Sequence, residues 1–263
     1  MARKWFAFDT IYGSMWYSNT GVFFMYNDEL YSKKRPNVGV TIIPFIYDEG
    51  EIKALTYKRD LDAEVFPGRL AFPNCFYDRE GVESAEEAAI GALLSKTSIE
   101  LPYFEQLHTF SGNYIDPERI NTVNITYFSL VRLADVSEIG DPHYEKEWLT
   151  VDEIIAKKDL FAFNHYEVFD YAWKRIRAKA EYTPIATNLL DEMFTIVEFK
   201  KLTEKLLGFE LNNARLRDRI EVSELLIPCE GMFKTHSTKP AQLYKLNPLN
   251  DGVFYPRSMT KAK

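Results

Sequence analysis

Hydrophobic and polar residues are arranged in the N-terminal part of the chain as they are in β-strands. Aromatic residues crowd positions 1–36 and are interrupted by glycines and by Asn27-Asp28, which predicts short strands joined by tight turns. An apolar, β-branched run covers 38–47, and after an acidic turn containing glycine an alternating stretch covers 52–57. This spacing predicts a β-hairpin.

A helix and further strands are predicted next. Ser84-Ala-Glu-Glu87 has the form of a capping box, which predicts a helix that begins there and continues through Leu94. The segments 104–110 and 121–131 are rich in β-branched or aromatic residues and predict strands. A hairpin, a helix and then more strands indicate an α+β sandwich.

The C-terminal third has the pattern of a helix-turn-helix. Asn164-His-Tyr-Glu167 repeats the N-cap pattern, and the helix that it begins is expected to end before Thr183-Pro184. Thr195-Ile-Val-Glu198 is a capping box for a second helix that ends at Gly208. Asn212 would cap a third helix, whose Leu and Ile residues face inward and whose Arg residues face outward.

Two short strands are predicted after these helices. The segments 225–228 and 241–246 flank a polar, basic loop, 234–239. Strands with a basic tip after a helix-turn-helix form a wing. The boundary between the acidic body and this C-terminal region is expected within 182–191.

Composition narrows the class of protein. The 263 residues are 46% hydrophobic and 27% charged, which excludes a disordered chain, a collagen and a disulfide-stapled miniprotein. Cys75 and Cys229 lack CxxC spacing, so no metal site or redox pair is expected and a reducing cytoplasm fits best. No apolar run approaches membrane-spanning length, and the N-terminal one ends at Asp9, too early for a secretory signal. We expect a cytoplasmic protein without a membrane partner.

Charge is distributed unevenly along the chain. Residues 195–263 contain twelve Lys and Arg against eight Asp and Glu, which is a net charge of +4. Because the whole chain has a net charge of −7, residues 1–194 have a net charge of −11. A basic region on an acidic body is suited to a polyanion such as nucleic acid. Chance clustering on a solvated surface is the other interpretation, and charge alone does not decide between them.

One segment contains a motif with chemical meaning. Residues 70–76 are Leu-Ala-Phe-Pro-Asn-Cys-Phe, and 81–90 are Gly-Val-Glu-Ser-Ala-Glu-Glu-Ala-Ala-Ile. This resembles the motif of Nudix hydrolases, in which a Pro-Gly-Gly turn precedes a helix whose glutamates hold Mg²⁺ against a diphosphate. Here the turn is Pro73-Asn74-Cys75, and the three glutamate positions fall on Ala92, Ser95 and Lys96. The resemblance therefore implies a Nudix fold with no metal, no cofactor and no catalytic residues.

Five further segments follow one another in the order found in a single family. Together they resemble landmarks of the Nudix-related transcriptional regulators, the NrtR family, over residues 37–247. The segments are Tyr103–Phe110, Asp116–Tyr127, Leu160–Glu167, Tyr182–Ala186 with Leu189-Leu190 and Phe194-Thr195, and Lys239–Leu246.

The resemblance implies an α+β architecture with three parts. Residues 1–36 would be an aromatic-rich N-terminal extension, 37–182 a Nudix-like α/β/α sandwich that senses a metabolite, and 183–263 a winged helix-turn-helix. The family binds DNA operators as homodimers and responds to ADP-ribose, to other NAD-related nucleotides or, in one branch, to a sugar.

The resemblance also implies a DNA-binding surface. The helix after Asn212 would enter the major groove, where Asn is suited to adenine and Arg to guanine. Other cations would bind phosphates or the minor groove. The candidates are Asn212, Asn213, Arg215, Arg217, Arg219, Lys234, His236 and Lys239. The alternative is a solvated helix face in which Arg217, Asp218, Arg219 and Glu221 form local ion pairs.

Candidate residues for the ligand are taken from their position in the family pattern. Guanidinium groups bind phosphate bidentately, and aromatic rings would face a sugar or a base. These candidates are Arg59, Arg69, Phe76, Arg119 and Tyr127. A structural salt bridge is the alternative role for Arg69 and for Arg119.

Three functions are thus compared. The first is a DNA-binding transcriptional regulator that responds to a small metabolite. The second is a divergent Nudix hydrolase that acts on a nucleoside diphosphate derivative with displaced carboxylates. The third is a non-catalytic module that binds a protein partner through the aromatic N-terminal segment.

Overall fold

The computed structural model describes residues 6–10, 13–18, 21–25, 36–77, 84–97, 103–112, 115, 121–136, 145–235, 239–250 and 255. The chain divides into two compact units, residues 1–36 and 37–263. In the first unit, β1 (Phe6–Thr10), β2 (Gly13–Ser18) and β3 (Gly21–Met25) form an antiparallel sheet in the order β1-β2-β3. The predicted boundary between residues 182 and 183 lies inside the second unit and stays a prediction.

A seven-stranded mixed sheet forms the first part of the second unit. Its main strands follow the order β10-β5-β4-β9-β8, with β6 beside β5 and β7 beside β4. The only parallel pairing between these described strands is that of β4 with β9. The strands are β4 (Asn37–Asp48), β5 (Glu51–Lys58), β6 (Leu70–Ala71), β7 (Asn74–Phe76), β8 (Tyr103–Gly112), β9 (Thr122–Leu130) and β10 (Lys146–Thr150). The predicted hairpin is confirmed as β4–β5.

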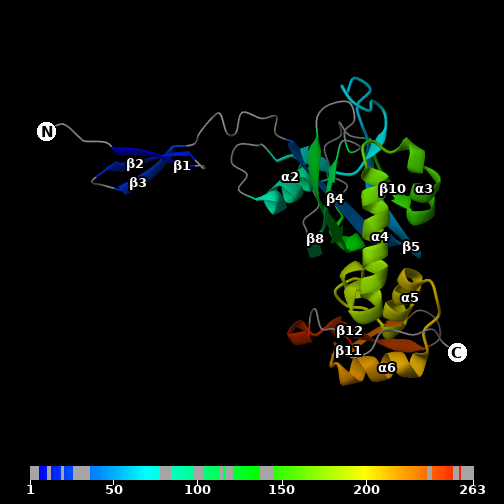
Figure 1. Cartoon of the computed structure of the whole chain (residues 1–263). Helices are drawn as coiled ribbons and strands as arrows, with labels where there is room; N and C mark the ends of the chain where they lie inside the picture. The colour runs from blue at the N-terminus through cyan, green and yellow to red at the C-terminus, as the bar shows by residue number, and fades with distance from the viewer. Residues whose placement is uncertain are drawn as a thin grey trace. The chain divides into compact units, whose positions relative to one another are not determined.

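Helices cover both faces of this sheet (Figure 1). Because successive strand residues point to opposite faces, Ile42 packs with α2 (Ala85–Thr97), whereas Ile43 and Phe45 face the other side. On that second side lie α3 (Val151–Ala156) and the long helix α4 (His165–Tyr182), whose Phe169 stacks on Phe45 at 6.1 Å. The predicted α/β/α sandwich is therefore present.

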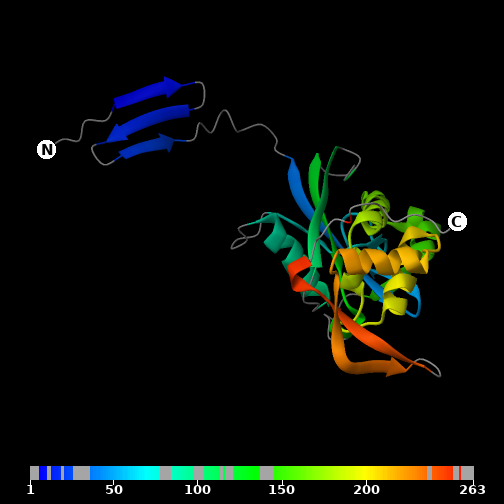
Figure 2. The ribbon, with the colours of Figure 1, turned by 90° about the horizontal axis from the view of Figure 1, so that it is seen from below.

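The predicted helix-turn-helix and wing follow α4. The short helix η3 (Ile185–Leu189) leads to α5 (Ile196–Leu207) and α6 (Asn213–Val222). The strands β11 (Leu226–Thr235) and β12 (Pro240–Leu246) pair antiparallel, and Figure 2 shows this wing extending beyond the helices. Both wing strands are longer than the segments predicted from the sequence.

Local helix signals are confirmed at α5. Thr195 and Glu198 form both bonds of the capping box, with Glu198 N donating to Thr195 Oγ1 at 3.2 Å. Gly208 ends the helix with φ of 77°, a left-handed conformation that glycine adopts without steric cost. In α2, the predicted first bond is also present, since Glu87 N donates to Ser84 Oγ at 3.1 Å.

One predicted cap has a different role. Asn164 occupies the N-cap position of α4, but its side chain forms no cap bond. Its Oδ1 instead accepts a hydrogen bond from Asn124 of β9 at 3.4 Å, which ties the start of α4 to the sheet.

The seven-stranded sheet and the winged helix share one hydrophobic core. A single cluster of buried residues includes Phe45 of the sheet, Phe169 of α4, Leu202 of α5 and Leu216 of α6. The winged helix is thus joined to α4 by buried apolar contacts as well as by the chain. None of the helices that the structure describes has both the length and the apolar composition needed to cross a membrane.

Candidate functional site

The first turn of α6 presents a polar, basic surface. Asn212 caps the helix, because its Oδ1 accepts from Arg215 N at 3.1 Å. Leu216 is buried at 2% exposure, so at helical spacing Arg215 and Arg217 lie on other faces, and both are exposed together with Asn213. Side chains at the N-terminal end of a second helix are those that reach base edges in a helix-turn-helix.

Two of the predicted DNA-binding cations are held against the protein instead. The guanidinium carbon of Arg219 lies 4.9 Å from the centre of the Tyr255 ring. Lys234 Nζ lies 2.7 Å from Glu198 Oε1. Burial alone would raise the pKa of Glu198, but hydrogen bonds from Lys234 and Thr195 lower it below its ordinary value. Arg219 is therefore half-buried and not directed outward as predicted, whereas the phosphate contacts of both cations stay predictions.

The other wing residues are placed as follows. Lys239 is exposed at the start of the second wing strand, whereas His236 lies outside the described residues. Met232 and Phe233 of β11 are exposed at 43% and 57%. The described surface of the wing is therefore apolar as well as basic.

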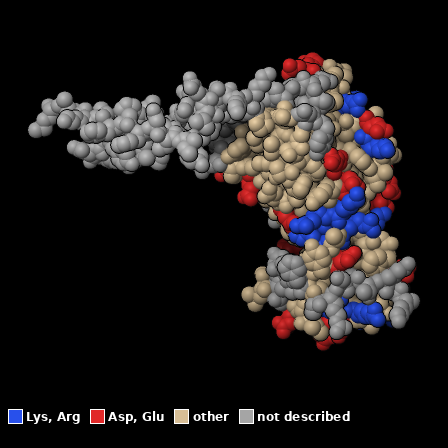
Figure 3. Space-filling model, viewed as in Figure 1, with Lys and Arg blue, Asp and Glu red and all other residues tan. Residues whose placement is uncertain are grey.

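Where the sheet and its helices meet the winged helix, Arg and Lys side chains form hydrogen bonds and ion pairs with other residues of the protein. Figure 3 shows Lys and Arg side chains gathered over α4 near this junction. Arg177 of α4 donates from Nε to Leu206 O and from Nη2 to Leu207 O, both at 2.9 Å, and so satisfies carbonyls at the C-terminus of α5. Lys205 Nζ of α5 lies 2.6 Å from Oε2 of Glu51, the first residue of β5.

A pocket of about 320 Å³ opens between the sheet and the start of α4. Polar groups from several elements line it, and hydrogen bonds fix some of them. Tyr57 Oη donates to Asn74 Oδ1 at 2.7 Å, and Thr41 Oγ1 donates to Asn124 Oδ1 at 3.1 Å. The lining residues are Gly39, Val40, Thr41, Tyr57, Arg59, Asp60, Ala63, Asn74, Cys75, Phe76, Ile115, Thr122, Asn124, Phe163 and His165.

Arg59 is fixed at one side of this pocket. Its Nε and Nη2 donate to Val65 O at 3.1 and 2.8 Å, and its guanidinium carbon lies 4.9 Å from the centre of the Phe163 ring. Phe163 in turn meets Phe66 edge to face at 5.0 Å. Both phenylalanines have positive φ, 52° and 53°, a strained backbone for a bulky residue that often accompanies binding sites.

His165 connects the pocket with α4. It is the first residue of the helix, is 2% exposed, and its Nδ1 accepts from Phe72 N at 3.0 Å. An accepting Nδ1 places the proton of the neutral imidazole on Nε2. The pocket and the base of the helix that leads to the winged helix therefore share a residue.

The structure brings together some of the predicted ligand residues. Arg59 and Phe76 line the pocket, whereas Arg69 donates to Asp159 O at 2.5 Å beside another surface depression. Tyr127 points to the opposite face of the sheet, where it is buried and stacks on Phe104 at 4.8 Å. Arg119 lies outside the described residues.

Several residues that line the pocket were not among the ligand-binding residues predicted from the sequence. Thr41 of β4 and Asn124 of β9 are buried polar residues on the face of the sheet that bears the pocket. A polar residue at an inward-facing strand position is the signal by which they are detectable. Asn74 was noted only as a departure from the Nudix turn, and Tyr57 only as part of a strand.

The helix α2 occupies the place of the Nudix motif helix. Ala92 is 4% exposed, and Ser95 Oγ donates back to Ala92 O at 3.2 Å. The Cys75 thiol donates to Ala88 O at 3.4 Å and so ties the preceding turn to this helix. Among the described residues there is no cluster of three or more His, Cys, Asp or Glu side chains that could hold a metal ion.

Comparison with known proteins agrees with this architecture. Residues 186–246 match the family model of the NrtR DNA-binding winged helix domain. An "ADPR responsive transcriptional repressor NtrR" from Acinetobacter baylyi is 28% identical over 226 residues, which are 85% of this chain and 87% of the relative.

Solved structures extend the likeness to the sensor. NrtR of Shewanella oneidensis, crystallised with a 27mer DNA, is 28% identical with a TM-score of 0.74, and the match covers 85% of this chain and 99% of that one. A MutT/nudix family protein from Enterococcus faecalis, 22% identical over 82% of this chain and 89% of its own, has the same fold with a TM-score of 0.65. Residues 186–246 thus match the NrtR winged helix, and the chain as a whole is similar to Nudix-related transcriptional regulators of the NrtR family.

Proposed function

We propose that this protein binds an operator through α6 and releases or takes up the DNA in response to a small metabolite. The observation that carries the proposal is the exposed first turn of α6, where Asn213, Arg215 and Arg217 extend from a helix anchored by Leu216. Asn and Arg are the side chains best suited to adenine and guanine edges in the major groove. The relative crystallised with DNA supports this assignment.

The effector that we propose is ADP-ribose or another NAD-related nucleotide. The relative from Acinetobacter baylyi is named as responsive to ADPR. The pocket offers amide and hydroxyl groups from Tyr57, Asn74 and Asn124, which are suited to ribose hydroxyls, and a guanidinium from Arg59. A free sugar would use the same hydroxyl-binding groups but would leave the cation without an anionic partner.

We propose that the sensor has no hydrolase activity. The carboxylate positions of the Nudix motif are filled by Ala92, Ser95 and Lys96. A hard divalent cation needs oxygen ligands, which alanine and lysine do not supply. A panel of nucleoside diphosphate derivatives incubated with Mg²⁺ tests this point, and turnover of any of them would favour the divergent hydrolase instead.

We also propose that the protein acts as a homodimer on a palindromic site. Two copies of α6 would then occupy two half-sites about one helical turn of DNA apart. Light scattering of the free protein and of its DNA complex measures this stoichiometry. Two chains for each duplex support the proposal, and a single chain bound at one half-site contradicts it.

The direct test is fluorescence anisotropy with labelled DNA from upstream of the protein's own operon. We expect tighter binding to that DNA than to a scrambled duplex, and a response to ADP-ribose that a free pentose does not produce. Arg215→Ala should weaken operator binding by about 1–3 kcal/mol. Lys174→Ala is the matched control, because that side chain is 72% exposed on α4, outside the winged helix. Equal affinity for operator and scrambled DNA would reject the proposal.

The pocket is tested separately by Tyr57→Phe. This change keeps the ring and removes the hydroxyl that orients Asn74. Titration calorimetry with ADP-ribose should then show weaker binding by about 1 kcal/mol, while operator binding without the effector stays as in the wild type. Unchanged ADP-ribose affinity would place the ligand elsewhere.

A further inference from the structure

Tyr255 lies beyond the part of the chain that the winged-helix family model covers. That match ends at residue 246, and Tyr255 is the last residue that the structure describes. The residue is 6% exposed and belongs to the same cluster of buried residues as Leu216 and Ile220 of α6. A buried aromatic ring at this position requires an explanation, because it is neither in the helix-turn-helix nor in the wing.

Two contacts join Tyr255 to different helices. Its backbone N donates to the O of Tyr182, the last residue of α4, at 2.7 Å. Its ring lies beneath the guanidinium of Arg219, with 4.9 Å between the guanidinium carbon and the ring centre. Tyr255 therefore stands between the end of the long sensor helix and the last turn of α6.

The helix α6 is also attached through its buried face and through the segments at its two ends. It is 10 residues long, a length at which an isolated helix is marginal in water. Within it, only Leu216 and Ile220 are buried. At its start, Leu211 N donates to Glu204 Oε1 of α5 at 2.6 Å, and after its end Leu225 is buried and its O accepts from Asn247 N at 2.9 Å. The contact between Arg219 and Tyr255 supplies an attachment in the last turn.

The contact with Tyr255 distinguishes Arg219 from the other arginines of α6. Arg219 is half-buried, whereas Arg215 and Arg217 of the same helix are exposed. A cation over an aromatic ring is stabilised by the ring's quadrupole, more so where water is excluded. Burial raises the pKa of the Tyr255 hydroxyl above its ordinary value, so the ring stays neutral beneath the cation.

We infer that Tyr255 is a positioning residue for DNA binding, which holds the last turn of α6 against the end of α4 and keeps Arg219 directed inward. Arg219 then contributes to operator affinity through the orientation of α6, while Arg217 contributes through its charge. The inference rests on the proposed DNA-binding function for its effect on affinity. Its effect on α6 itself is independent of DNA.

The first experiment needs no DNA. Hydrogen exchange is measured for the amides of α6 in the full-length wild type and in the variants Tyr255→Leu, Tyr255→Phe and Arg219→Ala. Leu keeps apolar bulk and so protects the fold, while Phe keeps the ring. We expect about tenfold faster exchange in the last turn of α6 for Tyr255→Leu and Arg219→Ala, equivalent to about 1.4 kcal/mol. For Tyr255→Phe we expect the amides of α6 to exchange at the wild-type rate. The amides of α5 should exchange at the wild-type rate in every variant.

The second experiment measures operator affinity across a salt series. Loss of a phosphate contact lowers the slope of log K against log salt by about one, whereas loss of a positioning contact weakens binding without changing the slope. We expect Arg217→Ala to lower the slope, and Arg219→Ala and Tyr255→Leu to weaken binding about tenfold at an unchanged slope.

Each outcome decides one question. A lower slope in Arg219→Ala would overturn the inference, because Arg219 would then contact phosphate directly. Wild-type exchange of α6 in Tyr255→Leu would overturn it as well. If the wild type shows no preference for the operator, the proposed DNA-binding function fails, and the exchange experiment alone decides whether Tyr255 positions α6.

Discussion

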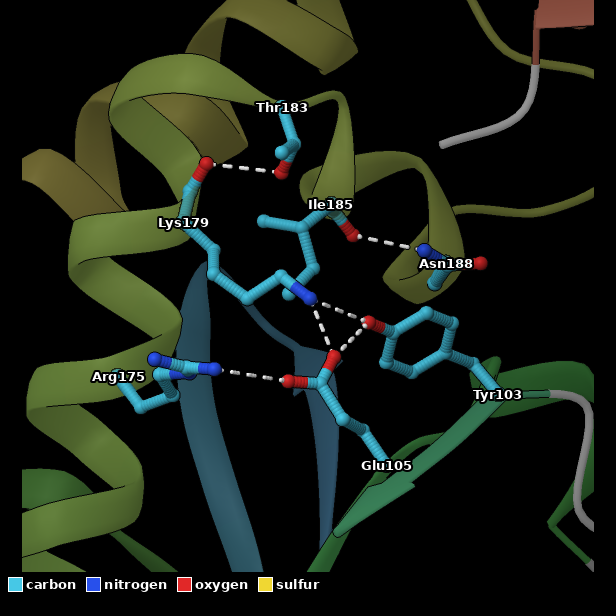
Figure 4. Close-up of polar contacts among 7 residues, drawn as sticks. All are labelled: Tyr103, Glu105, Arg175, Lys179, Thr183, Ile185 and Asn188. Atoms are coloured by element: carbon cyan, nitrogen blue, oxygen red, sulfur yellow. Dashed lines mark hydrogen bonds and ion pairs between the residues drawn. The ribbon is translucent and has the colours of Figure 1, made fainter. Parts of the chain in front are cut away.

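Replacing Lys179 with Met is expected to destabilise the protein where the sensor sheet meets the last turn of α4. Figure 4 shows the contacts that would be lost: Lys179 Nζ binds Glu105 Oε2 and donates to Tyr103 Oη at 3.1 Å. Tyr103 Oη in turn donates to Glu105 Oε2 at 2.7 Å, and Arg175 Nη2 lies 3.5 Å from Glu105 Oε1. Met keeps the apolar stem of lysine and removes only the charge.

The magnitude follows from the exposure of the pair. The side chains of Lys179 and Glu105 are 17% and 24% exposed. Exposed ion pairs contribute about 0.2–1 kcal/mol, whereas breaking a fully buried pair costs about 3–5 kcal/mol. A pair between these limits, with Arg175 left as a partial substitute, is expected to cost about 2 kcal/mol. For a unit of this size, that corresponds to a fall in Tm of about 4–8 °C.

The effect should depend on pH in a definite direction. Burial alone would raise the pKa of Glu105, but hydrogen bonds from Lys179 and Tyr103, with the charges of Lys179 and Arg175, lower it below its ordinary value of 4.5. A carboxyl with a lowered pKa in the folded state stabilises the fold above its unfolded pKa, and this contribution is lost as the pH falls through the folded pKa. The destabilisation by Lys179→Met should therefore be largest near neutral pH and should shrink below about pH 4.5.

The assay is urea unfolding of the wild type, Lys179→Met, Glu105→Gln and the double variant at pH 7 and at pH 4. The double-mutant cycle isolates the coupling between the two side chains. We expect a coupling of about 1–2 kcal/mol at neutral pH. A coupling within about 0.3 kcal/mol of zero would refute the reasoning, since it would show that solvent screens this pair as it does a surface pair.

Further predictions concern α5, and urea unfolding at pH 7 is the measurement for each. Thr195→Ala removes the hydroxyl that accepts from Glu198 N and should cost about 1–2 kcal/mol, whereas Val197→Ala, at an exposed position in the same turn, should change stability by less than about 0.5 kcal/mol. Gly208→Ala should cost about 1–2 kcal/mol, because alanine is strained at φ of 77° and its Cβ would lie 3.2 Å from Arg177 Nη2. Arg177→Met should cost about 2 kcal/mol through the loss of two hydrogen bonds to the end of α5. A smaller loss for Thr195→Ala than for Val197→Ala would contradict the assignment of the cap.

Features fixed by neighbours in the sequence were predictable, and features fixed by distant residues were not. The capping box at Thr195 and the end of α5 at Gly208 follow from local hydrogen bonding and local backbone conformation. Asn164 has the same local signal, but the side chain of Asn124 competes for it across the fold. Arg219 has a partner at Tyr255, which lies beyond the helix-turn-helix in sequence, so helical periodicity alone places it outward.

The ligand pocket illustrates a second limit. Both faces of β9 are covered by helices, so the strand is buried or half-buried along its whole length, and exposure does not distinguish its two faces. Tyr127, a candidate ligand residue from its position in the family pattern, packs toward α2. Asn74 and Cys75, in the segment that resembles the Nudix motif, line this pocket.

The contacts at the junction indicate which parts of the molecule a bound ligand can rearrange. Coupling between an effector site and a second site is typically about 1–3 kcal/mol. The exposed pair of Lys205 with Glu51 is weak enough for such a coupling to break, since surface pairs contribute about 1 kcal/mol or less. The buried core that α4 shares with α5 is not, because exposing one residue such as Leu202 costs about 2–5 kcal/mol. Helix α4 spans 18 residues, about 27 Å, from His165 at the pocket to the winged helix. If the proposed effector binds in the pocket beside His165, it would act on an assembly of α4 and α5 held by this core, and the pair of Lys205 with Glu51 at the start of β5 is the contact that such binding could break.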